Sequence, residues 1–444
     1  MTRARALLAA VALAVAGAAL MLAGCGDAPA PSAAVAADPS CAQAADACVT
    51  VGIGEPMYLG TLLYPSDDGG VVTARSVQLA VDYLDGRFDG QPGTLRGHTV
   101  DVIPEAESCT PMSGRAAARR LLAAAPILGV IGTTCSAAAY RAAAEVLSSH
   151  RVLLISPTTT SPLLTTPQGH DRYFFRTAFN DLIQAAAVAE FATGRLHART
   201  AATVSVDDAY SRPLATEFAD AFAARGGRLT ASLQVPDPLS QAKADDVALH
   251  LAAAPPGVIF LPMMDPGCST MVRAIRAQSA LASVPVVVSE ACMSSTFLRG
   301  MGSMADGLYA SGPDPSGSGT GAGSFAQAQF LPAYRRQFGQ APTTAFAFAA
   351  FDATNLVIEA IRRTAVRLPG GALVINREHL RAAIIGIAGY NGLSGTLTCL
   401  PAGDCVPAAR ISVYRAPNWP VAGHVNVMPV FSTSRTLAEV TGGG

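Results

Sequence analysis

The sequence predicts an α/β protein made of two doubly wound, parallel-sheet lobes. Between residues 48 and 288, short apolar runs alternate seven times with amphipathic helical segments. This alternation is typical of parallel sheets with helices on both faces. Seven such units exceed one comfortable sheet, so two lobes are the economical arrangement. After residue 310 the alternation stops at a Gly-, Ser- and Pro-rich stretch, residues 311–323, which predicts a loop or hinge segment.

The predicted elements follow in chain order. Strands are expected at Val49–Ile53, Thr99–Ile103, Ile127–Ile131, Val152–Ile155, Ala201–Val206, Val258–Leu261 and Val286–Val288. Helices are expected at Thr73–Leu84, Ser113–Ala124, Ser136–Leu147, Asp181–Thr193, Arg212–Ala224, Ala242–Ala253, Ser269–Ser279, Ser324–Phe338 and Thr343–Val366. A hairpin is expected at Leu393–Tyr414, and residues 433–444 are expected to form a frayed tail.

The first 25 residues have the features of a targeting segment. Arg3 and Arg5 precede an almost wholly apolar run, Leu7–Leu22, which is followed by Ala23-Gly24-Cys25. Leu-Ala-Gly-Cys resembles the lipobox of bacterial lipoproteins, in which the cysteine becomes the lipidated first residue. Cys25 is therefore expected to hold the protein to the membrane through a lipid anchor. The alternative is an uncleaved membrane anchor, since the run approaches the length of a spanning helix.

Composition narrows the possible partners. Residues 26–47 are expected to be a flexible tether, because residues 26–40 are mostly Ala, Pro and Ser without a period. The formal net charge is −1, and there is no block of basic residues, so nucleic acid is not expected as a partner.

Eight cysteines remain once Cys25 is set aside, and an even number in an exported protein indicates disulfides. Eight cysteines allow about 105 connectivities, of which the pairing of neighbours is the simplest. That pairing is Cys41–Cys48, Cys109–Cys135, Cys268–Cys292 and Cys399–Cys405. Zinc is the alternative, but no Cys-x-x-Cys motif occurs and no His is near these cysteines. No cofactor or metal is expected.

Polar side chains follow several of the predicted strands, where ligands bind in open α/β sheets. Ser136 begins a predicted helix, Thr158, Thr159 and Thr160 follow one strand, and Tyr210 and Glu290 follow two others. Hydroxyls at a helix N-terminus would hold a carboxylate, and Glu290 would hold an ammonium. Tyr210 would cover the apolar middle. Together these groups suit a zwitterionic α-amino acid.

Each of these residues also has a structural interpretation. Ser136 can cap its helix, and the three threonines can belong to a turn. Tyr210 and Glu290 can be ordinary surface residues, and Met263 and Met264 can be core residues. The set taken together favours a ligand site.

Five segments resemble type I periplasmic binding proteins of the leucine/isoleucine/valine-binding family. They are GTTCSAAA, LLISPTTTSPLLT, YFFRTAFNDLIQAAAVAEFA, VDDAYSRPLATEFADAFAARGG and VSEACMS. Members of that family are substrate-capturing lipoproteins of ABC importers. In it, a disulfide of the first lobe has its second cysteine immediately before the ligand-binding Ser, and Cys109, Cys135 and Ser136 fit that pattern.

The resemblance also implies roles for the site residues. Ser136 and the loop of Thr158, Thr159 and Thr160 would bind the α-carboxylate, with Thr160 also touching the ammonium. Tyr210 would line the pocket from the second lobe, and Glu290 would accept from the ammonium.

Three other positions concern the rest of the pocket. Met263 or Met264 stands where branched-chain binders have a second-lobe tyrosine, and Met264 is included in the predicted site. Tyr58 or Tyr64 would form a wall from the first lobe, and Tyr58 is included.

The family fold further implies three hinge crossings, expected near residues 176, 311 and 392. Lobe 1 would then comprise residues 48–176 and 312–392, and lobe 2 residues 177–311 and 393–432. Closure of the lobes about these hinges would trap the ligand, and an ABC permease would read the closed form. The chain is expected to act as a monomer.

The sequence also bears on three alternatives, namely an enzyme, a ligand sensor and a binding protein for another cargo. No Gly-x-Ser-x-Gly, His-Glu-x-x-His or Walker motif occurs, and a dinucleotide loop beginning at Gly52 fails at Met57. The chain is therefore not expected to be an enzyme. The same fold can serve as a ligand sensor for a signalling partner, since fold alone does not determine function. The cargo could also be urea, a short amide or an aromatic acid.

Overall fold

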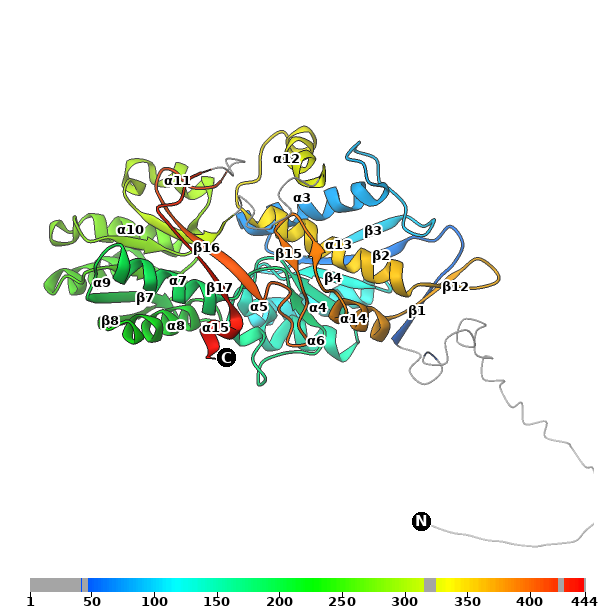
Figure 1. The fold of residues 1–444 in the computed structure, drawn as a ribbon, viewed down its shortest axis with the longest axis horizontal. Helices are drawn as coiled ribbons and strands as arrows, with labels where there is room; N and C mark the ends of the chain where they lie inside the picture. The colour runs from blue at the N-terminus through cyan, green and yellow to red at the C-terminus, as the bar shows by residue number, and fades with distance from the viewer. Residues whose placement is uncertain (1–40, 42–46, 315–324, 422–426, 443–444) are drawn as a thin grey trace, which may run out of the picture.

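The computed structural model describes residue 41 and residues 47–314, 325–421 and 427–442. Two α/β lobes lie side by side (Figure 1), and each is built on its own sheet. The predicted signal peptide, with Cys25, and almost all of the predicted tether lie outside the described residues. In the part of the chain that the structure describes, no helix combines the length and the apolar character needed to cross a membrane.

The sheet of lobe 1 has the strand order β3-β2-β4-β5-β6, and all its strand pairs are parallel. These strands are β2 (Met57–Leu63), β3 (Val100–Ala106), β4 (Gly129–Gly132), β5 (Leu153–Ser156) and β6 (Phe174–Arg176). One face is covered by α3 (Asp68–Asp82), α13 (Phe346–Thr364) and α14 (Arg377–Ile385). The other is covered by α4 (Pro111–Ala124), α5 (Ser136–Ala138) and α6 (Ala144–Ser149). Helix α12 (Phe325–Phe338) packs against α3 and α13.

The first predicted strand, Val49–Ile53, is wrong as a member of the parallel sheet. Residues Cys48–Val51 form β1, which pairs antiparallel with β13 (Leu373–Asn376) in a small sheet that also holds β12 (Val366–Arg367). The first strand of the parallel sheet is β2, and Gly60 makes the sequence of β2 less typical of a strand. A Cβ at Gly60 would lie 2.4 Å from the end of the buried Leu121 side chain of α4, which would have to shift to make room for it.

The sheet of lobe 2 has the order β17-β16-β11-β10-β9-β7-β8. Its parallel strands are β7 (Thr200–Val206), β8 (Arg228–Val235), β9 (Ile259–Leu261), β10 (Val286–Val288) and β11 (Tyr309–Pro313). Two antiparallel strands, β16 (Ala408–Arg415) and β17 (Phe431–Thr436), extend it. Its helices include α7 (Asp181–Gly194), α8 (Ser211–Ala224), α9 (Gln241–Ala253), α10 (Gly267–Arg276) and α11 (Ser295–Met301).

The predicted frayed tail is wrong for residues 433–442. Residues 431–436 pair with β16, and α15 (Leu437–Thr441) follows, capped by the Thr436 side chain on Glu439 N. Leu437 and Val440 pack on a small cluster with Ile183 and Ile411. The tail is ordered because it supplies an edge strand and an apolar helix face to lobe 2.

The predicted hairpin at Leu393–Tyr414 is also wrong. Its first part forms the short pair β14 (Tyr390–Asn391) and β15 (Thr396–Leu397), whereas β16 joins the sheet of lobe 2. Leu397, Cys399 and Cys405 lie in the core of lobe 1. The third crossing therefore follows Cys405 rather than lying near residue 392, because these buried side chains anchor residues 396–405 to lobe 1.

Candidate functional site

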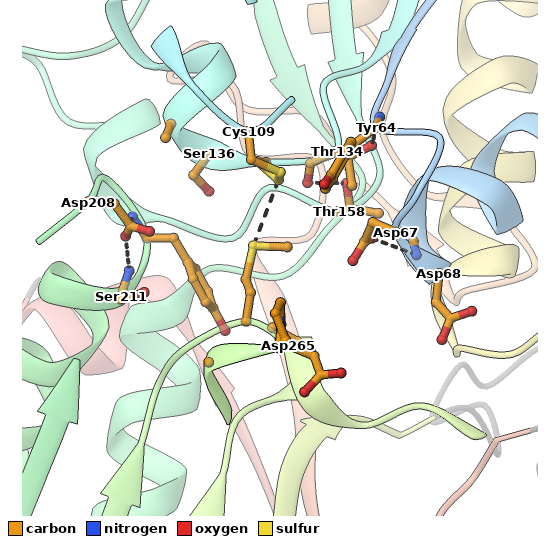
Figure 2. Close-up of a pocket in the computed structure, with 18 of the residues that line it drawn as sticks. Tyr64, Asp67, Asp68, Cys109, Thr134, Ser136, Thr158, Asp208, Ser211 and Asp265 are labelled. Atoms are coloured by element: carbon orange, nitrogen blue, oxygen red, sulfur yellow. Dashed lines mark hydrogen bonds between the residues drawn. A yellow bond between two sulfur atoms is a disulfide. The ribbon is translucent and has the colours of Figure 1, made fainter. Parts of the chain in front are cut away.

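A cavity of about 490 Å³ lies between the two lobes, where the carboxyl ends of both parallel sheets face each other. From lobe 1 it is lined by residues that follow β2, β3, β4 and β5, including Tyr64, Cys109, Ser136 and Thr158. From lobe 2 it is lined by residues that follow β7, β8, β9 and β10, including Tyr210, Met264 and Glu290. Figure 2 shows these two groups of side chains on opposite sides of the space.

Hydroxyl groups tie together the loops on the lobe 1 side. The Tyr64 backbone N–H donates to Thr134 Oγ1 at 2.9 Å. Thr158 Oγ1 lies 2.9 Å from the carbonyl oxygen of Thr134 and 3.1 Å from that of Thr133. The Thr158 hydroxyl thus donates its proton to the backbone, which fixes the wall and leaves its oxygen as an acceptor at the cavity.

Thr159 and Thr160 do not line the cavity, contrary to prediction. Both are fully buried, and the Thr160 side chain lies behind the wall beside the carboxyls of Asp181 and Glu290. The carbonyl oxygen of Thr160 accepts from Asp181 N at 3.0 Å, and that of Thr159 accepts from Arg176 Nη1 at 3.3 Å. The loop turns behind its first threonine, so only Thr158 faces the ligand space.

Ser136 lines the cavity at the start of α5 and is 3% exposed. In Figure 2 its side chain lies on the lobe 1 side of the space, opposite the residues of lobe 2. The predicted helix Ser136–Leu147 is interrupted, because Tyr140 and Arg141 leave helical geometry, with φ of 48° at Arg141. The helix after Ser136 is therefore only one short turn, and its dipole is weaker than the sequence suggested.

The lobe 2 wall holds a nearly buried carboxyl, Glu290, which is 5% exposed. Glu290 Oε1 accepts from the Tyr210 hydroxyl at 2.7 Å, and Oε2 accepts from Gln184 Nε2 at 2.6 Å. Burial raises the pKa of Glu290, while these two donors pull it down. Burial and the neighbouring Glu290 charge raise the pKa of Tyr210, so its hydroxyl stays a donor.

A second carboxyl, Asp181, lies behind this wall and is fully buried. Burial and the charge of Glu290 raise the pKa of Asp181 well above its ordinary range. The Thr160 side chain lies within hydrogen-bond reach of the Asp181 carboxyl and lowers its pKa in part.

The sequence did not decide which of two methionines lines the pocket, and the structure places them differently. Met263 is fully buried in the core of lobe 2, whereas Met264 lines the cavity. Met264 Sδ lies 3.8 Å from Cys135 Sγ of lobe 1, and this contact spans the cleft (Figure 2). Met264 is thus the methionine that can contact both lobes and a ligand.

Tyr58 is wrong as a site residue. It lies near the amino end of β2, its carbonyl oxygen accepts from Leu128 N, and its side chain packs on the lobe 1 core. Because ligand sites form at the carboxyl ends of parallel strands, the first-lobe wall is Tyr64, just after β2. The error follows from placing the first strand at residues 49–53.

All four predicted disulfides are present, namely Cys41–Cys48, Cys109–Cys135, Cys268–Cys292 and Cys399–Cys405. The Cys109–Cys135 bond borders the cavity and precedes Ser136. Glu107 lies beside these cysteines and accepts from the backbone N–H groups of Cys109 and Thr134. Burial raises the pKa of Glu107 to about 7.

Five acidic residues at the cavity were missed by the sequence reasoning. They are Asp67, Asp68, Asp208, Asp237 and Asp265. Asp67 and Asp68 closely follow β2, and the other three follow β7, β8 and β9. Their position after strands was the available signal, and the pair after β2 was hidden by the misplaced first strand.

Comparisons with known proteins agree with this geometry. Residues 65–416 match the family model described as periplasmic binding protein. A search of curated proteins finds no match. The solved structures similar to this chain include a leucine-binding protein from Thermotoga maritima, with 20% identity, a TM-score of 0.70 and coverage of 85% of this chain and 98% of that one.

Two further structures have other ligands. A branched-chain amino acid transporter substrate-binding protein from Streptococcus pneumoniae, in complex with isoleucine, is 18% identical, with a TM-score of 0.70 and coverage of 86% and 99%. A solute-binding protein of an ABC transporter from R. palustris, in complex with benzoate, is 16% identical, with a TM-score of 0.69 and coverage of 86% and 97%. At these identities the likeness establishes the fold.

The predicted type I periplasmic binding protein fold is confirmed by these matches and by the two parallel-sheet lobes. The matching family consists of extracytoplasmic proteins that bind small molecules and work with ABC transporters, and it is not a family of enzymes. The family match covers most of the chain, from the end of β2 to the end of β16, and therefore both walls of the cavity. The chain belongs to the periplasmic binding protein family.

Proposed function

We propose that the protein is a lipid-anchored solute-binding protein that captures a small zwitterionic ligand, an α-amino acid, between two closing lobes. It delivers this ligand to an ABC importer. The observation that carries the proposal is Glu290, a nearly buried carboxylate at the cavity wall with two neutral donors, Tyr210 and Gln184. Among the described residues that line the cavity, none is Lys, Arg or His.

An ammonium group suits this wall for a physical reason. A carboxylate taken out of water is costly unless a cation or several donors compensate it. Burial raises the pKa of Glu290 even though Tyr210, Gln184, Thr160 and its own backbone N–H lower it, so its charge is compensated only in part. The α-ammonium of an amino acid would supply both the missing charge and further N–H donors.

The α-carboxylate would bind on the opposite wall. Ser136 and Ala137, the first residues of α5, line the cavity there, and the Ser136 hydroxyl would donate to the carboxylate. Thr134 and Thr158 hold the neighbouring loops in place through their hydroxyls. The ligand would then touch lobe 1 with its carboxylate and lobe 2 with its ammonium, so that binding stabilises the closed arrangement.

The ligands of similar structures are consistent with this class. The proteins from T. maritima and S. pneumoniae are named for leucine and branched-chain amino acids. The benzoate complex represents the alternative of an aromatic acid. An anion without an ammonium suits this cavity poorly, because its charged lining residues are all acidic.

The first experiment is calorimetric titration of residues 26–444, unfolded and refolded beforehand to remove retained ligand, against amino acids, urea, short amides and benzoate. The variant Glu290→Gln should bind amino acids more weakly by about 1.5–3 kcal/mol, the value of a hydrogen bond to a charged group. Glu145→Gln, at a position whose side chain is 61% exposed, is the matched control and should bind as the wild type does.

Each result leads to a distinct conclusion. An unchanged affinity in Glu290→Gln would remove the ammonium assignment and favour an uncharged ligand such as urea or an amide. Binding of benzoate but of no amino acid would replace the amino acid by an aromatic acid. If the protein binds an amino acid whose cellular uptake is unaffected by deletion of the gene, sensing would replace transport. Loss of lipid labelling in Cys25→Ala tests the anchor.

A further inference from the structure

The cavity between the lobes has a strongly one-sided charge. Six carboxyl side chains line it, and among its described lining residues no basic side chain balances them. The chain as a whole is nearly neutral, with 31 Lys and Arg against 32 Asp and Glu, so this asymmetry is local. The six are Asp67 and Asp68 of lobe 1 and Asp208, Asp237, Asp265 and Glu290 of lobe 2. One ammonium at Glu290 leaves the other five without a cation.

Two of these carboxylates are held in place from opposite lobes. Asp67 Oδ1 accepts from the backbone N–H groups of Gly69 at 2.7 Å and Gly70 at 3.3 Å, where α3 begins. Asp265 Oδ1 accepts from Ser269 N at 3.1 Å and from the Ser269 hydroxyl, where α10 begins. In both cases the fold holds one carboxylate oxygen, and the group cannot swing away into solvent without losing these hydrogen bonds.

Closure of the lobes brings these charges together. The contact of 3.8 Å between Cys135 Sγ and Met264 Sδ shows that the two walls already meet at one point, next to Asp265 in sequence. Burial chiefly raises the pKa of Asp67, and the charges of Asp68 beside it and of Asp265 across the cleft raise it further. Like charges facing each other in a partly desolvated cleft oppose closure. A ligand with excess positive charge between the lobes would replace this repulsion by attraction and would favour closure.

The spacing of the acidic groups disfavours a metal ion as this cation. In the part of the chain that the structure describes, Glu107, Cys109 and Cys135 form the one group of three potential ligands that converges within 4.8 Å. Both of those cysteines are bonded in a disulfide. The carboxylates of Asp67, Asp68 and Asp265 lie too far apart to coordinate one ion together, and an organic cation can span them.

A buried hydroxyl lies beside one of these carboxylates. Ser211 lines the cavity and is fully buried, and its side chain lies within hydrogen-bond reach of the Asp208 carboxylate. Ser211 stands beside Asp208, so an N–H of a cationic ligand could be shared between them.

We propose that the ligand carries a second cationic group besides its α-ammonium, as the basic amino acids do, and that this group lies between Asp67 of lobe 1 and Asp265 of lobe 2. The proposal rests on the proposed function, because the α-carboxylate and α-ammonium occupy the sites described above. It adds the side-chain class, which is cationic rather than branched and apolar. It also gives the two lobes a direct electrostatic reason to close around the ligand.

The first test compares lysine with norleucine, which has the same carbon chain without the terminal ammonium. Calorimetric titrations with lysine, ornithine, arginine, norleucine and leucine at pH 7.5 measure each affinity. At least one basic amino acid should bind roughly tenfold or more tighter than norleucine, as expected for a charge pair in a partly buried site. Raising the ionic strength from about 0.1 M to about 1 M shortens the Debye length from about 10 Å to about 3 Å and should reduce this advantage.

Two variants then locate the second cationic group. Asp67→Asn and Asp265→Asn keep an oxygen that can accept the backbone hydrogen bonds at the start of each helix and remove only the charge, so both should fold. Each should lower the preference for the basic amino acid over norleucine severalfold. Asp246→Asn, at an exposed position of α9 away from the cavity, is the control and should keep the preference.

The outcomes separate this inference from the proposed function. Leucine or norleucine binding as tightly as lysine, ornithine and arginine would overturn the inference and leave the amino-acid function standing. Preference for a basic amino acid that survives in both Asp67→Asn and Asp265→Asn would overturn the assigned position. Binding of cadaverine and of no amino acid would support the second cationic group and overturn the amino-acid class. If none of these compounds bound, both the inference and the proposed function would be overturned.

Discussion

The Arg176 guanidinium lies 2.7 Å from Asp404 Oδ1, although the two residues are 228 positions apart in the chain. Arg176 is fully buried, and Asp404 is nearly so. The same guanidinium donates to the carbonyl oxygen of Ser161 at 2.7 Å and to Thr165 Oγ1 at 2.8 Å. It therefore ties the threonine loop of the ligand site to the segment that leads into the third crossing. The charge of Asp404 is what allows this cation to be buried.

Removing that charge should destabilise the protein. Asp404→Asn keeps an acceptor oxygen but leaves the Arg176 charge uncompensated, which typically costs about 3–5 kcal/mol for a buried pair. The free energy of unfolding from urea titration is the measurement. Glu145→Gln breaks the exposed pair with Arg115 and should change stability by less than about 1 kcal/mol. Equal effects of the two variants would refute this account of the hinge.

The Tyr210 hydroxyl should matter through Glu290. Tyr210→Phe removes a donor 2.7 Å from Glu290 Oε1 and keeps the ring. Amino-acid affinity at neutral pH should fall by about 0.5–1.5 kcal/mol, the net value of one hydrogen bond. Tyr309→Phe, a tyrosine of lobe 2 that does not line the cavity, is the control. A loss in both variants would indicate a packing effect instead.

Affinity should depend on pH in a defined direction. Burial raises the pKa of Glu290, so the free protein takes up a proton there at higher pH than an exposed Glu does. Only the ionised form attracts an ammonium. Affinity should therefore be full above the raised pKa and fall as the pH drops through it, and calorimetry across pH 5 to about 8 would follow this change. Glu290→Gln should flatten the profile, and a profile that survives in this variant would place the titrating group elsewhere.

The neighbouring methionines should separate into two roles. Met263 is fully buried in the core, so Met263→Ala should lower the free energy of unfolding by about 2–5 kcal/mol. Met264 faces the cavity and touches Cys135, so Met264→Ala should change ligand affinity or selectivity with a smaller effect on stability. Urea titration and calorimetry on both variants measure the two effects. The reverse pattern would contradict the assigned positions.

Glu107 should make stability fall as the pH rises from about 4.5 to 7. Burial raises its pKa from 4.5 to about 7, so in this window the folded protein binds a proton that the unfolded chain has lost. The stability of the wild type relative to Glu107→Gln should shrink by up to about 3 kcal/mol across the window and then level off. Unfolding free energies of both proteins at several pH values give this difference. A constant difference would mean that Glu107 ionises normally.

The sequence by itself determined the architecture and the centre of the site. Alternating apolar runs and amphipathic helices predict parallel lobes, because strand and helix periodicity are local properties. Disulfide partners lay close in the chain, and all four pairs form as neighbours. Ser136, Tyr210 and Glu290 could be placed at the cavity because each follows a strand in sequence, and the carboxyl ends of parallel strands share one edge.

Only the tertiary structure decided which neighbours of those residues face the ligand. Thr158 lines the cavity while Thr159 and Thr160 turn away, because Arg176 and Asp181 draw their carbonyl oxygens inward. Residues 396–405 stay with lobe 1 because Leu397 and the Cys399–Cys405 pair are buried there.

The clustering of carboxyl side chains at the cavity depends on tertiary structure in the same way. Asp67 and Asp265 are almost 200 positions apart, and each looks like an ordinary turn residue in its own segment. Their opposition across the cleft exists only once two sheets are placed edge to edge. Local propensity encodes the elements, whereas the charge of a site between lobes arises from contacts between distant parts of the chain, which local pattern does not carry.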